Sequence, residues 1–305
     1  MKVCSIIVTF NGLRNNWIKR CLESLLTSTI KTEIIVIDNN SSDNTVKFIK
    51  EFFPSIHVIE NKINLGFGQA NNLGFKFGLN LACNYFFLLN QDATVYNDSI
   101  EKLIKTHINN LNYGILSPIH LNGNGTNLEF FFKSLINNSN TKDYINDLVL
   151  NKNKNCLYEI NFINAACWLI PLNTLIQVGG FNPSFFHYGE DDNYCHRTRF
   201  KNLKIGLVTN AYITHDTDDR PKSIYETKLN IKKRKILAEY SNPLVQNDIH
   251  KLRFETRNKL IKSFILYNKY TFNYYKNLYQ FINNNYKTIN KNLSLSKENN
   301  KYIFL

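Results

Sequence analysis

Two runs of polar residues are candidates for catalysis or ligand binding. The first is Asn-Gln-Asp at 90–92. It directly follows the apolar run 85–89, so it stands where a buried strand would end. Asparagine and aspartate are common in turns, and a simple turn is the more frequent reason for such a triplet. The alternative is that Asp92 binds a divalent cation, because Mg²⁺ and Mn²⁺ take carboxylate oxygens and leave positions for substrate phosphates.

The second run is acidic, Glu-Asp-Asp at 190–192, and it follows the aromatic stretch 185–188. A carboxylate held near apolar walls has a raised pKa, which suits a general base. Acids also favour the first turn of a helix, where they complement the helix dipole, and both interpretations can hold together. Further along, His215 precedes Asp216. A lone histidine is more often structural, but at the end of a strand it would also suit a metal ligand.

A glycine-containing stretch, 64–72, superficially resembles a dinucleotide-binding fingerprint. Its sixth position is Asn71 rather than glycine, and it does not follow the first strand, so we exclude a nicotinamide site. Glycines that open a helix still let the backbone approach a phosphate or a ribose. The sequence contains neither a Walker A lysine motif nor a zinc-type set of cysteines and histidines.

The elements that position these residues follow from the hydrophobic periodicity. Apolar runs predict strands at 3–9, 33–38, 56–60 and 85–89. Helical spacing predicts helices at 17–26, 46–53 and 66–81, the second capped by Ser42 or Asp43. This alternation favours a parallel, doubly wound sheet, in which ligands bind beyond the carboxyl ends of the strands. Thr9, Asp38 and the run 90–92 all fall at such ends.

The second half of the sequence is less regular. Residues 122–158 indicate a variable insertion of loops and helices. A helix is expected to contain Tyr194, Arg197 and Phe200. Two strands are expected at 205–208 and 211–214, the second ending at His215.

The net charge of +13 is concentrated in the C-terminal part, because residues 221–305 hold 17 basic and 5 acidic residues. Amphipathic and aromatic patterns predict helices there, with a frayed segment at 283–301. A basic tail indicates an acidic partner. Three interpretations stay open: helices that pack on the preceding domain, a basic and aromatic surface on an anionic membrane, and nucleic-acid binding, for which the tail has no recognised module.

The cysteines and the apolar runs indicate the compartment. Six cysteines are scattered without paired spacing, which is typical of free thiols in a reducing environment. The N-terminal apolar run is too short for a signal peptide, and no stretch of about 18 apolar residues could span a membrane. We therefore expect a cytoplasmic protein.

Six blocks of the sequence occur in the order typical of one enzyme family. They are CSIIVTFNG, EIIVIDNNSSDNT, NLGFGQANNLG, FFLLNQDATV, VGGFNPSFFHYGEDDNYCHR and the last strand before His215. With these blocks the chain resembles, from about Val3 to His215, the family 2 glycosyltransferases of the GT-A fold, especially the rhamnosyltransferase-like branch. The resemblance implies an α/β fold, a Rossmann-like mixed sheet with flanking helices, as a catalytic domain at 1–220. A basic, aromatic-rich helical extension would follow at 221–305.

The resemblance also implies roles for individual residues. Asp191 matches the catalytic base of the family, with Glu190 as the runner-up. Asp92 is the last acid at the position of the D-x-D motif and would contact the Mg²⁺ or Mn²⁺ ion, whose shell His215 would complete. The residues expected to bind the nucleotide sugar are Thr9, Phe10, Asn11, Asp38, Asn39, Ser41, Asn64, Gly66, Asn71, Asn90 and Gln91. Those expected on the acceptor side are Trp168, Phe185, Phe186 and His187.

Two positions depart from the family pattern. The first aspartate of D-x-D is Asn90 here, so one carboxylate is missing and looser metal binding is expected. In the family motif E-D-x-D-x-x-x-R, Asn193 replaces an acid. Arg197 is retained, and we expect it to pair with a nearby carboxylate.

The implied reaction is transfer of a sugar from a UDP- or dTDP-linked donor to a hydroxyl of a glycan or lipid-linked acceptor, with inversion at the anomeric carbon. The expected pathway is surface polysaccharide biosynthesis. The expected location is cytoplasmic and peripheral, on the inner face of the cytoplasmic membrane, with no nucleic-acid partner. The alternative is a non-catalytic nucleotide-sugar-binding subunit of a membrane-associated glycan assembly complex. A nucleotidyltransferase would need a glycine-rich, lysine-bearing phosphate loop near the N-terminus, which this sequence lacks.

Overall fold

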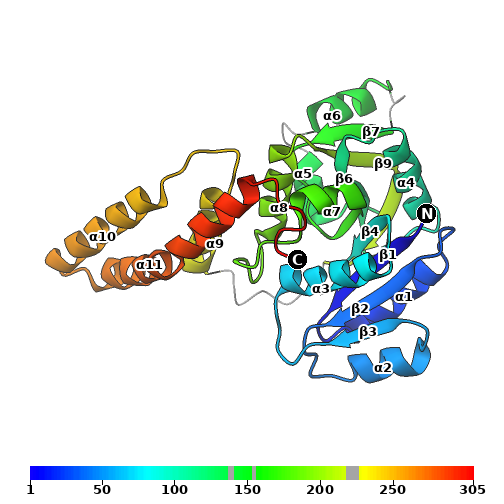
Figure 1. The fold of residues 1–305 in the computed structure, drawn as a ribbon, viewed down its shortest axis with the longest axis horizontal. Helices are drawn as coiled ribbons and strands as arrows, with labels where there is room; N and C mark the ends of the chain where they lie inside the picture. The colour runs from blue at the N-terminus through cyan, green and yellow to red at the C-terminus, as the bar shows by residue number, and fades with distance from the viewer. Residues whose placement is uncertain (137–140, 153–155, 218–226) are drawn as a thin grey trace.

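The computed structural model describes residues 1–136, 141–152, 156–217 and 227–305. One sheet runs through the N-terminal two-thirds of the chain (Figure 1), in the order β3-β2-β1-β4-β8-β6-β9-β5, with β7 beside β9. Its strands are β1 (Val3–Thr9), β2 (Glu33–Asp38), β3 (His57–Glu60), β4 (Tyr85–Leu89), β5 (Ala93–Val95), β6 (Tyr113–Asn122), β7 (Leu157–Ile160), β8 (Cys167–Pro171) and β9 (Lys204–His215).

Helices cover both faces of this sheet and continue beyond it. They are α1 (Trp17–Leu26), α2 (Thr45–Phe52), α3 (Phe67–Asn80), α4 (Ser99–Ile108), α5 (Phe130–Ile136), α6 (Lys142–Val149), α7 (Leu172–Val178), α8 (Glu190–Phe200), α9 (Lys228–Tyr240), α10 (Ile249–Ile265) and α11 (Lys269–Lys297). Apolar side chains of α1, α2 and α4 pack on one face, and those of α3, α5, α7 and α8 on the other. All six cysteines are free thiols, and five of them are buried.

The N-terminal half of the sheet is parallel, as the alternation of strands and helices predicts. β1 pairs in parallel with β2 and with β4, and β2 pairs in parallel with β3. The remainder is mixed, because β8 is antiparallel to β4 and β5 is antiparallel to β9. Only the run 90–92 separates β4 from β5, whereas a parallel crossover needs about a dozen residues or more. The all-parallel prediction is therefore wrong beyond β4, where among the described strands only β6 and β9 pair in parallel, and the mixed sheet implied by the family resemblance is confirmed.

The two strands predicted at 205–208 and 211–214 are one strand in the structure. β9 runs without interruption from Lys204 to His215, and its parallel pairing with β6 shifts in register between Val208 and Tyr212. Such an irregularity bends a strand without ending it. The polar residues between the two apolar runs therefore mark a bulge-like irregularity and not a turn.

The predicted fraying at 283–301 is also wrong, because α11 continues to Lys297. Ile282 and Ile289 are fully buried and lie two helical turns apart, on one face, in an apolar cluster shared with α9 and α10. Tertiary packing therefore holds this asparagine-rich segment in a helix.

The C-terminal helices join the rest of the protein at one end only. Figure 1 shows α10 and α11 projecting together away from the sheet, whereas the last residues return to it. The Gly180 N–H donates to the Ile303 carbonyl (2.8 Å), and the Tyr302 N–H donates to the Ile176 carbonyl (3.2 Å). The predicted domain boundary at 220/221 lies outside the described residues, so the division into two domains stays a prediction. No helix in the described ranges is long and apolar enough to cross a membrane.

Candidate active site

Parallel pairing brings distant polar residues to one edge of the sheet. Thr9, the last residue of β1, lies in register with Asp38, the last residue of β2. The Asn39 N–H donates to the Thr9 carbonyl (2.8 Å). On the other side of β1, Asn90 follows the end of β4. The three stretches that the sequence singled out at strand ends therefore share one edge, as predicted for this kind of sheet.

Gln91 ties the end of β4 to the end of β1. Its Oε1 accepts hydrogen bonds from the Thr9 hydroxyl (2.6 Å) and the Phe10 N–H (3.0 Å), and its Nε2 donates to the Phe10 carbonyl (3.1 Å). These bonds use the amide within the protein, so Gln91 positions Thr9 and Phe10. The Phe10 side chain is 47% exposed, which leaves its ring available for stacking.

The loops after β1 and β2 are joined by a second network. The Asp38 carboxylate is buried and accepts from the Ser41 hydroxyl (2.5 Å) and the Ser41 N–H (2.9 Å). The Ser41 hydroxyl accepts from the Asn11 N–H (2.9 Å), and Asn11 Oδ1 accepts from the Ser42 N–H (2.8 Å). Asn11 has a φ of 51°, in the left-handed region that asparagine tolerates better than most residues. The predicted residues Asn11, Asp38 and Ser41 thus form one connected group.

The loop that opens α3 contacts the segment before α8. Asn64 Oδ1 accepts from the Gly66 N–H (2.8 Å), and Asn39 Nδ2 donates to the Gly66 carbonyl (3.2 Å). Gly66 has a φ of +80°, and a Cβ at this position would lie 1.9 Å from the backbone oxygen of Phe186. Only glycine suits both conditions. The predicted donor loop and the predicted acceptor segment therefore touch through their backbones.

Asp92 and His215 meet at the same edge. The pairing of β5 with β9 places Ala93 beside His215. Asp92 Oδ1 lies 3.4 Å from His215 Nε2, both side chains are nearly fully buried, and Asn90 Nδ2 lies 3.3 Å from the same nitrogen. Within the described ranges, no group of three acids, cysteines or histidines is arranged to hold a metal ion.

The pair nonetheless suits an ion that is shared with a ligand. Two neighbouring ligand atoms on one small divalent cation lie about 3 Å apart, close to the observed separation of Oδ1 and Nε2. One carboxylate and one imidazole would leave most coordination positions for diphosphate oxygens and water. The residues present therefore fit a cation held jointly by Asp92, His215 and a bound nucleotide.

The acidic run 190–192 forms the first turn of α8. Burial, aided by the charge of Asp191, raises the pKa of Glu190 to about 8. The same two causes raise the pKa of Asp192 to about 7. Burial also raises the pKa of Asp191, although backbone N–H groups, including that of Asp192 at 2.9 Å from Oδ1, favour its charged form. A helix start and raised pKa values, the two features that the sequence indicated, thus occur together.

Within the described residues Arg197 pairs with no carboxylate, contrary to the expectation from the sequence. Its Nε donates to Asn193 Oδ1 (3.0 Å), and its two other nitrogens donate to the carbonyls of Val178 and Gly180 (both 2.6 Å). The Phe304 ring lies over the guanidinium, with Cζ 5.1 Å from the ring centroid. The last carbonyls of a helix lack partners within that helix. Those at the end of α7 therefore take the place of the expected acid, and Arg197 fastens α7 to α8.

Three of the predicted side chains point into the protein. Asn71 is 1% exposed and donates to a backbone carbonyl of its own helix (3.0 Å). Trp168 is fully buried between Phe181 and Tyr194, and Phe185 belongs to the apolar cluster of the C-terminal helices. We therefore assign Trp168 and Phe185 to the core and not to the acceptor side. Of the predicted acceptor residues, Phe186 is exposed and His187 is half-buried.

Sequence reasoning missed the contribution of α9 to this site. The Arg234 guanidinium stacks on the Tyr188 ring, with Cζ 4.6 Å from the ring centroid, and its positive charge favours the charged form of Glu190. Asn193 Nδ2 also donates to the Ser241 carbonyl just after α9 (3.0 Å). The basic run 232–235 was the available signal, but it was interpreted only as part of the charged tail.

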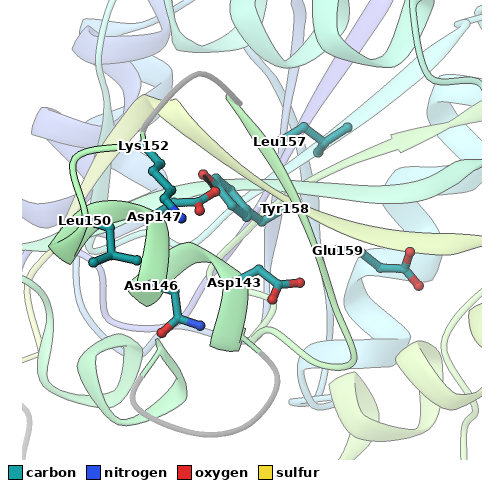
Figure 2. Close-up of a pocket in the computed structure, with 8 residues that line it drawn as sticks. All are labelled: Asp143, Asn146, Asp147, Leu150, Lys152, Leu157, Tyr158 and Glu159. Atoms are coloured by element: carbon teal, nitrogen blue, oxygen red, sulfur yellow. Dashed lines mark hydrogen bonds between the residues drawn. The ribbon is translucent and has the colours of Figure 1, made fainter.

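A cavity of about 720 Å³ lies elsewhere, between α6 and β7 (Figure 2). It is lined by Asp143, Asn146, Asp147, Leu150, Lys152, Leu157, Tyr158 and Glu159. The Tyr158 hydroxyl donates to Asp147 (2.9 Å), and Lys204 pairs with Glu159 (2.6 Å). Because protein groups already satisfy these polar atoms and no predicted site residue lines the cavity, we do not consider it the active site.

Comparison with known proteins identifies the family. A family model described as glycosyl transferase family 2 matches residues 4–164, just over half of the chain. Low-salt glycan biosynthesis hexosyltransferase Agl10 of Haloferax volcanii is 28% identical over 244 residues, covering 77% of this chain and 75% of that protein. Glycosyltransferase GlyA of Streptococcus pneumoniae is 32% identical over 108 residues, covering 34% of this chain and 15% of that protein.

Solved structures establish the fold. S. aureus TarS 1–349 in complex with UDP superposes with a TM-score of 0.55 at 14% identity, covering 83% of this chain and 69% of that one. GalNAc-T7 with UDP, GalNAc and Mn²⁺ superposes with a TM-score of 0.56 at 16% identity, covering 82% and 53%. The sheet and its flanking helices are those of the GT-A fold. Together with the family match, this shows that the chain belongs to glycosyl transferase family 2.

Proposed function

We propose that this glycosyltransferase moves a sugar from a UDP- or dTDP-linked donor to a hydroxyl of a glycan or lipid-linked acceptor, with inversion at the anomeric carbon. The observation that carries the proposal is the backbone contact between Gly66 and Phe186. It brings the loop predicted to hold the donor against the segment that leads into the acids of α8. The donor-binding loop and the proposed catalytic base would therefore lie beside each other.

Asp191 is the proposed general base. The acceptor oxygen forms the new glycosidic bond, the bond from the anomeric carbon to the diphosphate breaks, and the acceptor proton passes to Asp191. General base catalysis of this kind contributes about 10²–10⁴-fold. A single displacement inverts the anomeric carbon and needs no carboxylate nucleophile. Glu190 is the weaker candidate, because a pKa of about 8 leaves it mostly protonated at neutral pH.

On the donor side, the exposed Phe10 ring would stack on the base, and the Asp38–Ser41–Asn11 network would fix the loops around the ribose. Asp92 and His215 would hold Mg²⁺ or Mn²⁺, which would supply charge neutralisation to the leaving diphosphate. The separation of these two side chains supports this role. The Mn²⁺ and UDP named for GalNAc-T7, a structure of the same fold, agree with it.

We further propose that the acceptor belongs to surface polysaccharide biosynthesis and that transfer occurs on the cytoplasmic side of an anionic membrane, which residues 221–305 contact. Agl10 is named for glycan biosynthesis, and the tail holds 17 basic residues against 5 acidic ones. Phe186 and His187 are the residues that we propose for the acceptor side.

The replacement Asp191→Asn tests the catalytic part of the proposal. Released nucleoside diphosphate is measured with UDP- and dTDP-sugars and a panel of glycan acceptors, and nucleotide affinity is measured by calorimetry. We expect turnover to fall by about 10²-fold or more while nucleotide affinity stays within about twofold. Asp192→Asn is the matched control, because it changes the neighbouring half-buried acid and is expected to retain most turnover. A wild-type protein that binds nucleotide without turnover on any donor would instead favour the non-catalytic subunit.

A further inference from the structure

The turn that joins α10 to α11 exposes a continuous set of large apolar side chains. We call residues 261–270 the hairpin tip. Phe264, Ile265 and Leu266 are each about two-thirds exposed, Tyr270 is 78% exposed and Tyr267 is 94% exposed. Single exposed apolar residues are normal on protein surfaces, but a contiguous group marks a site of interaction.

Packing within the described protein does not account for the composition of the tip. α11 is anchored through Leu278, Ile282 and Ile289, which lie further along the helix in the cluster with α9. The tip lies at the far end of the projecting helices (Figure 1). A shallow groove of about 440 Å³ runs over it, lined by Asn258, Ile261, Lys262, Ile265 and Leu266. The apolar side chains are therefore presented outward.

The charge around the tip is strongly positive. From Ile249 to Lys297 the sequence holds ten lysines and arginines and a single glutamate. Lys259, Lys262 and Lys269 are exposed and flank the apolar side chains. Lysines with long apolar stems beside exposed aliphatic and tyrosine side chains are typical of segments that lie in the interface of an anionic bilayer.

Other partners fit this surface less well. If two copies of the chain met through their tips, the flanking lysines of both copies would come close together. Their like charges would oppose the contact. Nucleic acid would use the lysines and could stack on the exposed Tyr267 and Tyr270 rings, but it would leave the exposed aliphatic side chains of Ile265 and Leu266 without a partner. An anionic lipid surface uses both the charge and the apolar side chains.

We propose that the hairpin tip inserts into the headgroup region of an anionic membrane, with Phe264, Leu266 and Tyr267 among the acyl chains and the flanking lysines at the phosphates. This refines the membrane contact proposed above for residues 221–305. It does not depend on the transfer reaction, because its test measures binding. The tip would lie in the interface and would not span the bilayer, in agreement with the absence of a spanning helix in the described ranges.

The first test is co-sedimentation of the full chain with vesicles of 30% phosphatidylglycerol in phosphatidylcholine, and with pure phosphatidylcholine. We expect binding to the anionic vesicles only. The double variant Phe264→Ser/Leu266→Ser should bind about tenfold or more weakly. The triple variant Lys259→Gln/Lys262→Gln/Lys269→Gln should lose both affinity and salt dependence. Leu111→Ser, at a residue 69% exposed on the catalytic part, is the matched control and should bind like the wild type.

A second test separates insertion from adhesion by charge. Trp17 and Trp168 are buried, so a tryptophan introduced by Tyr267→Trp would report on the tip alone in difference spectra. We expect a blue shift with anionic vesicles and quenching by brominated acyl chains. Equal vesicle binding by the Phe264→Ser/Leu266→Ser variant, or no blue shift, would overturn the proposal. So would a dimer that the same variant abolishes, because it would identify the tip as a contact between copies. Donor binding measured in parallel should be unchanged in every tip variant.

Discussion

At the scale of single residues, the three acids at 190–192 differ in their burial and therefore in their tendency to ionise. Glu190 is nearly fully buried, with a pKa raised to about 8, whereas its neighbours are half-buried. Among the residues that the structure describes, the buried Glu190 Oε2 has no hydrogen-bond partner. Burial of the carboxyl favours its neutral form, and it outweighs the backbone hydrogen bond and the Arg234 charge, which both favour the charged form. Glu190 is therefore mostly uncharged at neutral pH, which makes it a weaker candidate than Asp191 for the proposed base.

This difference predicts a pH-dependent stability effect of Glu190→Gln. The pKa of Glu190 rises from 4.5 to about 8 on folding, mainly by burial, so the folded state keeps a proton that the unfolded chain releases. The contribution of Glu190 to the stability of the wild type therefore falls as the pH rises from about 4.5 to about 8. Glutamine cannot ionise, so the variant should melt at a higher temperature than the wild type at pH 8.5. The difference should shrink toward zero near pH 5.

Melting temperatures at pH 5, 7 and 8.5 check this prediction. Glu51→Gln, at an exposed glutamate on α2, is the control and should show no trend with pH. A gain for Glu190→Gln that is the same at all three pH values would contradict the burial of a protonated carboxyl.

At the scale of elements, the site depends on close contacts between loops that only particular residues permit. Gly66 has a positive φ, and a Cβ added there would meet the backbone oxygen of Phe186, an atom that cannot rotate away as a side chain can. The Gly66→Ala variant should therefore lose nucleotide affinity by about tenfold or more. In addition, the positive φ should cost an alanine roughly 1 kcal/mol in the free energy of unfolding. Calorimetric titration with the preferred nucleoside diphosphate measures this loss.

Gly125→Ala is the matched control for this variant. Gly125 also has a positive φ, of +74°, but a Cβ there would meet the Tyr96 hydroxyl at 3.2 Å, which is the end of a side chain. The control should lose stability without losing nucleotide affinity. Equal nucleotide affinity in the two alanine variants would mean that the Gly66–Phe186 contact does not shape the donor site.

The joint between α7 and α8 carries a separate prediction. Arg197→Met would leave the buried carbonyls of Val178 and Gly180 without their donors, at a cost of about 2–4 kcal/mol in the free energy of unfolding. Arg199→Met, at a half-buried arginine on the same helix, should cost less than about 1 kcal/mol. Urea denaturation of both variants measures these costs. A loss below 1 kcal/mol for Arg197→Met would show that the guanidinium does not hold the two helices together.

Elements with a local signal were predictable, and those decided by tertiary contacts were not. β4 and β2 have the predicted bounds, because continuous apolar runs mark buried strands. The pairing of β5 with β9 was not foreseen, since three residues of sequence do not show that the chain turns to the far edge of the sheet. The helical state of 283–297 was missed because its polar composition hides the spaced, buried Ile282 and Ile289.

The site shows the same limit. The residues expected at the strand ends lie together because strand direction follows from the alternation of elements. Which side chains are engaged within the protein itself was not predictable, as Gln91 and Trp168 illustrate. The Gln91 amide bonds to Thr9 and Phe10, and the Trp168 ring packs against Phe181 and Tyr194. The family resemblance supplied a role for Arg197 but not its actual partners, which are backbone carbonyls.

At the scale of the whole molecule, the chain combines the sheet edge proposed to bind the donor with a basic projection. The C-terminal residues return to the end of α7 and to Gly180 just after it, and the Asn72 amide on α3 donates to the Phe304 carbonyl (3.2 Å). The tail is therefore fastened to the helix that follows the donor loop. These hydrogen bonds connect the C-terminal segment, which follows the hairpin tip in the chain, to the part of the protein that carries the proposed donor site.

We propose that the edge formed by β1, β2 and β4 binds a nucleoside diphosphate together with a cation at Asp92 and His215. Thermal unfolding with UDP, dTDP, GDP and CMP, each with Mn²⁺ or with EDTA, tests it most directly. A ligand at about 100 times its dissociation constant stabilises the folded state by about 2.7 kcal/mol. We predict such a shift with UDP or dTDP in Mn²⁺, and its loss in EDTA and in the Asp92→Asn variant. No shift with any of the nucleotides, or a shift that EDTA and Asp92→Asn leave unchanged, would contradict the claim.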